Sequence, residues 1–266
     1  MPNFYRDNDD ILFQFKHLDL DRIIELREDK FSNKDKSDYA PRSIADARDS
    51  YERIMDVVGD IAGNFVAPHA AEVDEEGAHF ENGEVRYAAA TEEGLKLCRQ
   101  ADLMGFTLPR RYGGLNAPMT AYCMAIEIIS RADAAFMNIY GLQCDNADTL
   151  YKFGSEEQRQ KYLPRFCSGE ETSAMVLTEP DAGSDLQAVM LKAHQDEQGV
   201  WRLNGVKRFI TNGCGPLHLV LARSEEGTHD GRGLSMFMYV RDEHMRIRRI
   251  ENKLGIHGSP TCEMQY

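Results

Sequence analysis

From the N-terminus to about residue 170, apolar residues recur with the spacing of an amphipathic helix. The clearest stretch follows Ser43, a residue type that caps helix N-termini, and continues to Pro68. Its apolar stripe contains Ile44, Ala47, Tyr51, Ile54, Val58, Ile61 and Phe65. Because proline lacks a backbone donor and clashes with the preceding turn, this pattern predicts one long helix that ends at Pro68.

Further helical patterns follow in the same half of the chain. One begins near Thr91, and another runs from Pro118 through Tyr122 to Ile129. The stretch 155–158 has the form of a capping box, in which a serine and a glutamine three residues later satisfy each other's backbone donors, so a helix is expected after it. The mixed acidic and basic stretch Arg27 to Ala40 is expected to be a solvated loop. Residues 1–172 are therefore expected to form an all-α helical domain.

Around Ser173 the pattern changes from helical to extended. Strand-forming residues dominate the stretches 174–177, 206–210, 217–221 and 234–240. Asn204-Gly205 between 201–203 and 206–208 is a strong two-residue hairpin signal, and the alternation over 245–248 suggests a strand with one solvated face. Several short strands within a hundred residues predict a small antiparallel β-barrel domain over 173–266.

Charge and composition narrow the class of protein. The 266 residues include 44 acidic and 31 basic side chains, a net charge of −13 that opposes binding to nucleic acid. No apolar run reaches the roughly 20 residues that span a bilayer, and the first residues lack the layout of a signal peptide. We therefore expect a cytoplasmic protein without membrane insertion. The spacing of the histidines and cysteines suggests no metal site.

Candidate chemistry begins where the first expected strand ends. The segment from Leu177 to Asp185 bends at Pro180 and then offers a glycine, which lets backbone N–H groups approach a ligand closely. Such amides, with the hydroxyl of Thr178, suit the polar edge of a flavin ring, where negative charge develops on reduction. Taken alone, the segment is also compatible with an acidic turn that leaves a strand.

Two motifs in this part of the sequence resemble those of a known family. Residues 178–185, Thr-Glu-Pro-Asp-Ala-Gly-Ser-Asp, and residues 209–213, Phe-Ile-Thr-Asn-Gly, resemble the two flavin-facing strands of acyl-CoA dehydrogenases. The second motif alone is also compatible with an ordinary barrel strand. The resemblance extends to 103–114, 154–164 and 254–263, and the N-terminal extension is similar to the branch of 3-methylmercaptopropionyl-CoA dehydrogenase and larger bacterial fatty acyl-CoA dehydrogenases.

The resemblance implies FAD as the cofactor and a set of residues that contact it. These are Met175, Leu177, Thr178, Gly183, Ser184, Phe209, Ile210 and Thr211, of which Ser184 is also implied in binding the acyl-CoA substrate. Many family members have tryptophan where this chain has Phe209, so the stacking surface is kept while an indole N–H is lost.

The resemblance also implies a reaction, the α,β-dehydrogenation of an acyl-CoA thioester in fatty acid β-oxidation, with electrons passed to an electron-transferring flavoprotein. Family members assemble as homodimers or homotetramers. They take their catalytic glutamate from a C-terminal helical domain, whereas this sequence ends at Tyr266. We therefore expect a truncated chain without that domain and without a catalytic base. Glu179 and Asp185 are expected to have structural roles.

Other interpretations stay open at this point. An acyl-CoA oxidase uses the same scaffold but returns electrons to oxygen, and a non-catalytic protein could bind flavin or CoA without turnover. The DNA-binding branch of the superfamily conflicts with the net charge of −13. His257 is read as a turn residue or as a ligand contact. The basic residues between Arg241 and Lys253 are read as a solvated strand face or as a contact for CoA phosphates.

Overall fold

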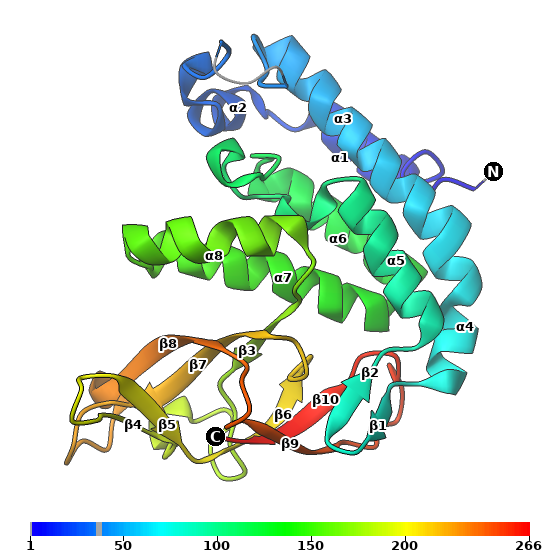
Figure 1. Ribbon diagram of the computed structural model, residues 1–266. Coiled ribbons are helices and arrows are strands. Elements are labelled where there is room, and N and C mark those ends of the chain that lie inside the picture. Colours follow the sequence, from blue (N-terminus) through cyan, green and yellow to red (C-terminus); the bar gives the residue numbers. More distant parts are fainter. Residues whose placement is uncertain (1, 36–38) are drawn as a thin grey trace. The chain divides into compact units, whose positions relative to one another are not determined.

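The computed structural model describes residues 2–35 and 39–266 (Figure 1). It contains two compact units, and each is described by itself. Unit 1 comprises 1–73 and 89–170, and unit 2 comprises 74–88 and 171–266. A helical part followed by a sheet-rich part is therefore confirmed. The expected domain boundary at 172/173 stays a prediction, because the compact units divide the chain differently at the inserted segment 74–88.

Unit 1 is built from helices. They are α1 (Asp9–His17), α2 (Asp21–Arg27), α3 (Ile44–Ile61), α4 (Ala67–Glu76, shared with unit 2), α5 (Ala89–Gln100), α6 (Met119–Ala132), α7 (Ala134–Phe153) and α8 (Glu156–Ser168). Single helical turns are Asp29–Phe31, Leu103–Gly105 and Arg110–Tyr112. The stretch Arg27 to Ala40 thus contains the end of α2 and a helical turn, and part of the expected loop, 36–38, lies outside the described residues. Among the described residues, no helix is both long enough and apolar enough to cross a membrane.

The predicted caps are confirmed, but the expected end of α3 at Pro68 is wrong. Ser43 accepts from the backbone of Asp46, and Ser155 with Gln158 forms the capping box of α8. After Ile61 the chain passes through a π-helical turn, Ala62–Val66, and continues as α4 through Pro68. In this wider turn the N–H of Ala67 bonds to the carbonyl of Ala62, so the hydrogen-bond ladder is already shifted before the proline, which donates none.

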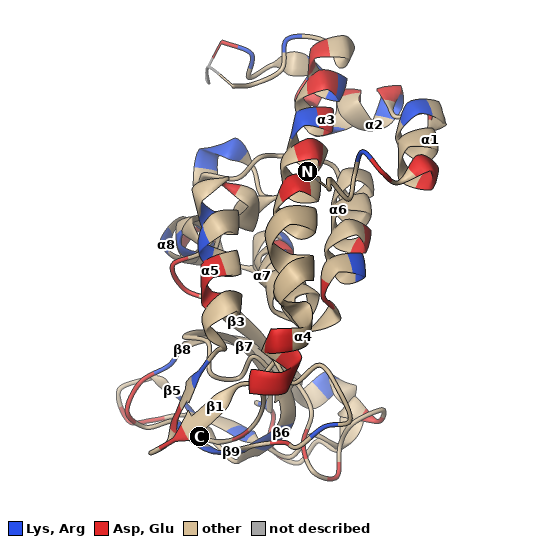
Figure 2. Ribbon diagram, turned by 90° about the vertical axis from the view of Figure 1, so that its right-hand side faces the viewer, with Lys and Arg blue, Asp and Glu red and all other residues tan. Residues whose placement is uncertain are grey.

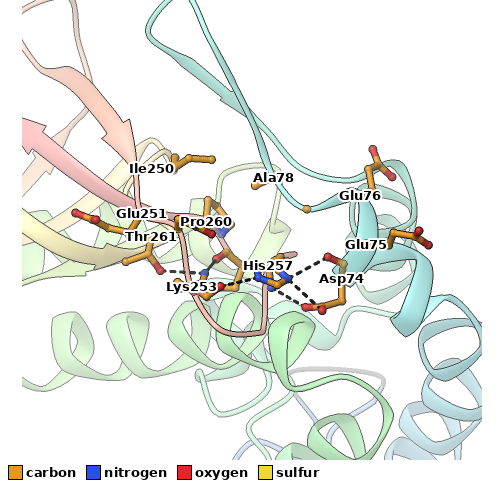
Figure 3. A pocket seen from close by; sticks show the side chains of 13 residues that line it. Asp74, Glu75, Glu76, Ala78, Ile250, Glu251, Lys253, His257, Pro260 and Thr261 are labelled. Atoms are coloured by element: carbon orange, nitrogen blue, oxygen red, sulfur yellow. Dashed lines mark hydrogen bonds and ion pairs between the residues drawn. The ribbon is translucent and has the colours of Figure 1, made fainter.

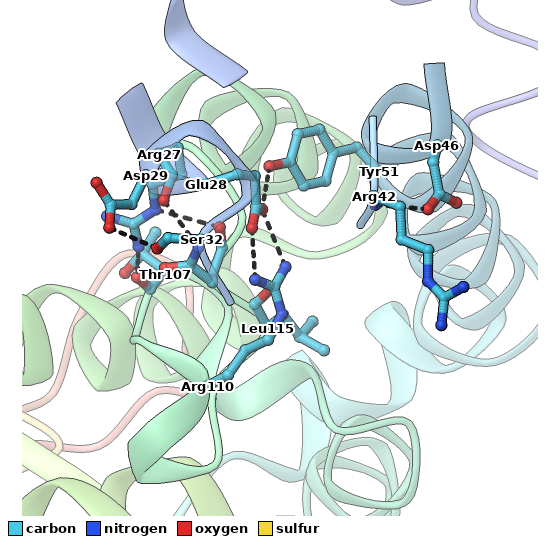
Figure 4. Close-up of polar contacts among 11 residues, drawn as sticks. Arg27, Glu28, Asp29, Ser32, Arg42, Asp46, Tyr51, Thr107, Arg110 and Leu115 are labelled. Atoms are coloured by element: carbon cyan, nitrogen blue, oxygen red, sulfur yellow. Dashed lines mark hydrogen bonds and ion pairs between the residues drawn. The ribbon is translucent and has the colours of Figure 1, made fainter. Parts of the chain in front are cut away.

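A buried charged network lies in unit 1 and includes Tyr51 of α3 (Figure 4). The carboxylate of Glu28 is 3% exposed and accepts from the Tyr51 hydroxyl at 2.7 Å. Arg110 approaches it with both terminal nitrogens, at 2.5 and 2.9 Å. A bidentate guanidinium satisfies a buried carboxylate, and burial together with Glu28 raises the pKa of the Tyr51 hydroxyl.

Unit 2 contains a hairpin and two larger sheets. The hairpin is β1 (His79–Glu81) with β2 (Glu84–Arg86). One sheet has the order β6 (Val206–Thr211), β10 (Thr261–Gln265), β9 (Arg246–Ile250). The other has the order β3 (Ser173–Val176), β7 (Leu217–Arg223), β4 (Lys192–Gln195), β5 (Trp201–Asn204), with β8 (Leu234–Val240) also paired to β7. Helical turns Leu186–Ala188 and Gly231–Gly233 lie between strands.

The two sheets share one apolar core, as expected for a small barrel-like domain. It includes Val176 and Val220 from one sheet and Ile210, Ile247 and Met264 from the other. Most strand pairs are antiparallel, but β7 runs parallel to both β3 and β4, so the sheet is mixed rather than antiparallel throughout.

The expected hairpin at Asn204-Gly205 is wrong. The strands on either side of it, β5 and β6, belong to different sheets. Gly205 exchanges backbone hydrogen bonds with Tyr266, and a side chain there would lie 3.0 Å from the backbone of Leu191. The glycine therefore serves a sheet change at a crowded position, and the observed hairpin joins β4 to β5 instead, around the turn that starts at Asp196.

Candidate functional site

The first motif forms a tight turn directly after β3. Glu179 and Ala182 exchange backbone hydrogen bonds of 2.9 and 3.2 Å across Pro180 and Asp181. The Glu179 carboxylate is buried and accepts from the backbone N–H groups of Met190 and Leu191 at 2.8 and 2.9 Å. Asp185 caps the next helical turn by accepting from the N–H of Gln187. Both acidic residues thus have the structural roles expected from the sequence.

The second motif lies beside the first, held there by a lysine that the sequence reading did not single out. Lys207 of β6 is completely buried, and its ammonium donates to the carbonyl of Leu177 at 2.7 Å and pairs with Glu179 at 2.9 Å. Burial lowers the pKa of Lys207, and the Glu179 carboxylate opposes that shift. The N–H of Arg208 donates to the carbonyl of Thr178 at 3.0 Å. Segments 30 residues apart are thereby joined into one site.

A β-bulge determines how β6 presents its aromatic residue. Ile210 pairs with Cys262 and Lys207 with Met264, so Arg208 and Phe209 together oppose the single residue Glu263. Phe209 has a φ of 61°, in the left-handed region, and is 50% exposed. Bulges re-aim side chains, and here the result is that Lys207 and Ile210 both point inward while Phe209 points out. A positive φ is uncommon for a bulky residue, and such conformations cluster at functional sites, although Phe31 and Ile256 of this chain also have a positive φ.

The other predicted cofactor residues differ in what they can offer. Met175, Leu177, Thr178 and Thr211 are half-buried, and Gly183 and Ser184 are exposed. Ile210 is 2% exposed within the core, and its carbonyl accepts from the N–H of Gly213 at 3.2 Å, so its side chain is not exposed to a ligand.

Unused hydrogen-bonding groups lie in both motifs. In the described part of the chain, the hydroxyls of Thr178 and Thr211 and the backbone N–H groups of Gly183 and Ser184 have no hydrogen-bond partner. A methyl group at Gly183 would lie 3.9 Å from the methyl of Thr178, which places these two residues next to each other. Such donors beside an exposed aromatic ring fit a planar ligand with a polar edge, such as a flavin.

His257 takes part in a structural clamp rather than pointing a free nitrogen at a ligand (Figure 3). Its backbone N–H donates to Asp74 at 2.8 Å, its Nδ1 lies 3.1 Å from the Asp74 carboxylate, and its Nε2 lies 2.8 Å from the carbonyl of Lys253. These contacts favour the turn interpretation. They border a cavity of about 570 Å³. Acidic residues gather at the end of α4, where Asp74, Glu75 and Glu76 follow one another (Figure 2).

The basic run between Arg241 and Lys253 is largely paired within the protein. Arg241 pairs with Glu84 at 2.8 Å, and Arg248 and Arg249 pair with Glu263 at 3.1 and 2.9 Å. This pairing favours the interpretation as a strand face over a phosphate contact. Among the described residues, no group of three or more histidine, cysteine or acidic side chains is placed to hold a metal ion.

Comparison with known proteins agrees with this geometry. The acyl-CoA dehydrogenase N-terminal domain model matches residues 48–170, and the middle domain model matches residues 174–266. The chain is 32% identical to isovaleryl-CoA dehydrogenase of Solanum tuberosum over 82% of this chain and 51% of that protein. It is 31% identical to 3-methylmercaptopropionyl-CoA dehydrogenase of Ruegeria pomeroyi over 97% of this chain and 44% of that protein.

A solved structure supports the same relationship. The acyl-CoA dehydrogenase of Bacillus anthracis, determined in complex with FAD, superimposes with a TM-score of 0.70 at 28% identity, covering 82% of this chain and 35% of that chain. The chain spans about half the length of the curated relatives it matches. Two successive family domains match across both units, and the first motif forms a tight turn at residues 179–182, called the signature turn below. The chain therefore belongs to the acyl-CoA dehydrogenase family.

Proposed function

We propose that the site formed by the two motifs binds FAD, and that the protein is an acyl-CoA dehydrogenase that converts a thioester to its 2,3-enoyl form. One observation carries the proposal: Lys207 and the Arg208–Thr178 backbone bond join the signature turn to the strand that exposes Phe209. Unused donors and an exposed aromatic ring thereby lie at one place in unit 2.

The residues proposed to contact FAD differ in the part of the cofactor that they would bind. Thr178, Gly183 and Ser184 would hold the polar edge of the ring system through hydroxyl and amide donors, while Phe209 would contact its apolar face. Met175, Leu177 and Thr211 would complete the contact surface, and Ile210 would support it from the core. Ser184 would also contact the acyl-CoA. FAD, when bound, supplies the acceptor for the hydride that leaves the thioester β-carbon.

Proton removal needs a carboxylate that this site does not offer. Glu179 is occupied by two backbone donors and Lys207, and Asp185 caps a turn. Asp181, the third carboxylate of the first motif, is exposed in the turn and lacks the burial that poises a catalytic carboxylate. A general base must lie within hydrogen-bond reach of the proton that it removes and must be free to accept it. We therefore propose that the base comes from outside the two motifs. Electron transfer to an electron-transferring flavoprotein, homo-oligomeric assembly and a cytoplasmic location belong to the same proposal.

The test is an anaerobic titration. The purified chain is mixed with FAD, and the visible spectrum is recorded before and after a panel of acyl-CoA thioesters is added. A perturbed flavin spectrum with micromolar binding supports the FAD site, and unaltered free-flavin absorbance contradicts it. Bleaching by a thioester would show that a base is present in these 266 residues. The rate at which O2 restores the colour then separates an oxidase from a dehydrogenase.

A further inference from the structure

Arg208 lies between two carboxylates and the exposed ring of Phe209. Its Nε donates to Glu251 at 2.9 Å and lies 3.5 Å from Glu263. The centre of its guanidinium is 4.6 Å from the centroid of the Phe209 ring. The guanidinium therefore has two carboxylates near its Nε and an aromatic ring within cation–π distance.

The carboxylates that hold Arg208 are themselves well anchored. The side chains of Glu251 and Glu263 are only 16% and 11% exposed. Glu263 also pairs with Arg248 at 3.1 Å and with Arg249 at 2.9 Å, and Glu251 lies 3.5 Å from Arg249. A charge network with several fixed partners restrains each side chain more than an isolated surface pair does.

Glu263 is also the residue that the bulge of β6 opposes. A second register shift, between β10 and β9, lies beside the same residue, so Arg248 and Arg249 both reach it from β9. The left-handed backbone of Phe209 is disfavoured for a residue with a Cβ, and such conformations persist where the surroundings over-determine them. Arg208 is anchored to Glu263 across the bulge, so its side chain is placed to hold Phe209 in this conformation.

We infer that Arg208 is a positioning residue: held by Glu251 and Glu263, its guanidinium packs on the Phe209 ring and fixes the orientation in which that ring meets a planar ligand. The inference rests on the proposed function, because the ligand is taken to be the isoalloxazine ring of FAD. A ring that is already fixed before binding loses less conformational freedom when the ligand arrives, so Arg208 strengthens binding without touching the ligand.

The experiment compares Arg208→Met with Arg246→Met as the matched control. Arg246 is an exposed arginine of β9 that makes no ion pair with any described residue. Two quantities are measured: the NMR signals of ring-labelled Phe209 in the ligand-free chain, and the FAD dissociation constant from flavin fluorescence. A cation–π contact and its preorganisation correspond to a change of about threefold to tenfold in affinity.

For Arg208→Met we expect shifted, motionally averaged Phe209 ring signals and a three- to tenfold weaker FAD affinity, with Arg246→Met like the wild type. Arg208→Lys keeps the charge but not the planar fork, and is expected to restore little. Unchanged ring signals in Arg208→Met would overturn the inference. If that variant does not fold, Glu263→Gln loosens one anchor and is read by the same signals. A wild-type chain that binds no FAD refutes the proposed function, while the ligand-free ring signals still decide the role of Arg208.

Discussion

At the scale of single residues, the buried pair of Lys207 and Glu179 connects the two motifs. The ammonium is fully buried, and its carboxylate partner is nearly so. Removing one member of such a pair leaves an uncompensated buried charge, which costs roughly 3–5 kcal/mol. We therefore expect Lys207→Met to lower the free energy of unfolding by about this amount in urea titrations, with Lys192→Met, an exposed lysine of β4, as the control.

The same pair allows a second comparison that separates charge from packing. In the double variant Lys207→Met with Glu179→Gln, no unpaired charge remains, so the loss of stability should be smaller than in Lys207→Met alone. If the double variant is as unstable as the sum of the two single variants, the two side chains act independently and the charge argument fails.

At Gly183 of the first motif, one substitution is expected to weaken FAD binding without lowering the free energy of unfolding. Its φ is not positive, and a methyl group there would lie 3.9 Å from Thr178, which is ordinary van der Waals contact. Gly183→Ala should therefore leave the free energy of unfolding unchanged or raise it by roughly 0.4–1 kcal/mol. The added methyl should weaken FAD binding, because it projects where a ligand would approach the backbone donors.

Fluorescence titration with FAD and chemical unfolding, done on the same preparations, check this prediction. Gly199→Ala is not a suitable control, since Gly199 has a φ of 75° and an alanine there is strained. Gly255→Ala is, because the space around Gly255 is open and its φ is not positive. Equal FAD affinity in Gly183→Ala and the wild type would remove the backbone amides of this turn from the proposed site.

At the scale of elements, strand β7 carries a buried histidine that makes stability depend on pH. His218 lies between the Tyr266 hydroxyl at 2.8 Å and the Gly215 carbonyl at 2.7 Å, which implies that the neutral ring accepts from the tyrosine and donates to the carbonyl. Burial lowers the pKa of His218 to about 4, with the charge of Arg241 acting in the same direction and the carbonyls of Gly213 and Gly215 opposing it. The folded chain therefore resists protonation.

The direction of the pH dependence of stability follows from proton uptake by the unfolded chain. Between pH 6.5 and pH 4 the unfolded chain binds a proton at this histidine that the folded chain does not, so stability falls as the pH falls through this window. The shift corresponds to about 3 kcal/mol. Urea unfolding at pH 7, 6, 5 and 4 should show a shallower acid loss in His218→Gln than in the wild type. His194→Gln, an exposed histidine of β4, should keep the wild-type slope.

Signals that act through neighbouring backbone atoms predicted the helix caps, whereas the expected stop at Pro68 and the expected hairpin at Asn204-Gly205 were wrong. Ser43 and the pair Ser155 with Gln158 act through neighbouring backbone atoms, so their caps could be read directly. The long helix α7 was not predicted, because polar residues such as Gln143 and Asn146 are buried in it and obscure the apolar stripe.

The same limit applies to the candidate site. The motif match indicated Thr178 and Phe209, but simple alternation along β6 places Lys207 and Phe209 on one face, whereas the bulge separates them. A bulge depends on the partner strand, here Glu263 of β10, more than fifty residues away in sequence. Lys207 was likewise not recognised, because a fully buried lysine is understood only once its partners are known.

At the scale of the whole molecule, unit 2 is discontinuous in sequence. In sequence, the hairpin segment 74–88 falls between two helical segments of unit 1, yet it belongs to the same compact unit as 171–266. Val85 packs against the barrel core, and Glu84 pairs with Arg241 at 2.8 Å. The part of the chain that carries the two motifs therefore packs with a segment that precedes the motifs by almost a hundred positions.

Tyr87 is the contact through which this dependence can be tested. Its hydroxyl donates to the buried Asn212 side chain at the end of β6 and lies 3.0 Å from the Thr172 hydroxyl, just before β3. Tyr87→Phe leaves the Asn212 acceptor without this donor, which costs about 1–3 kcal/mol. Because Asn212 and Thr172 flank the two strands of the proposed site, amide hydrogen exchange should accelerate at 172–176 and 206–213. Arg86→Gln, an exposed substitution on the same hairpin, should leave both stability and exchange unchanged. If Tyr87→Phe accelerates exchange in 74–88 alone, the hairpin does not stabilise the strands of unit 2, and the proposed site does not depend on it.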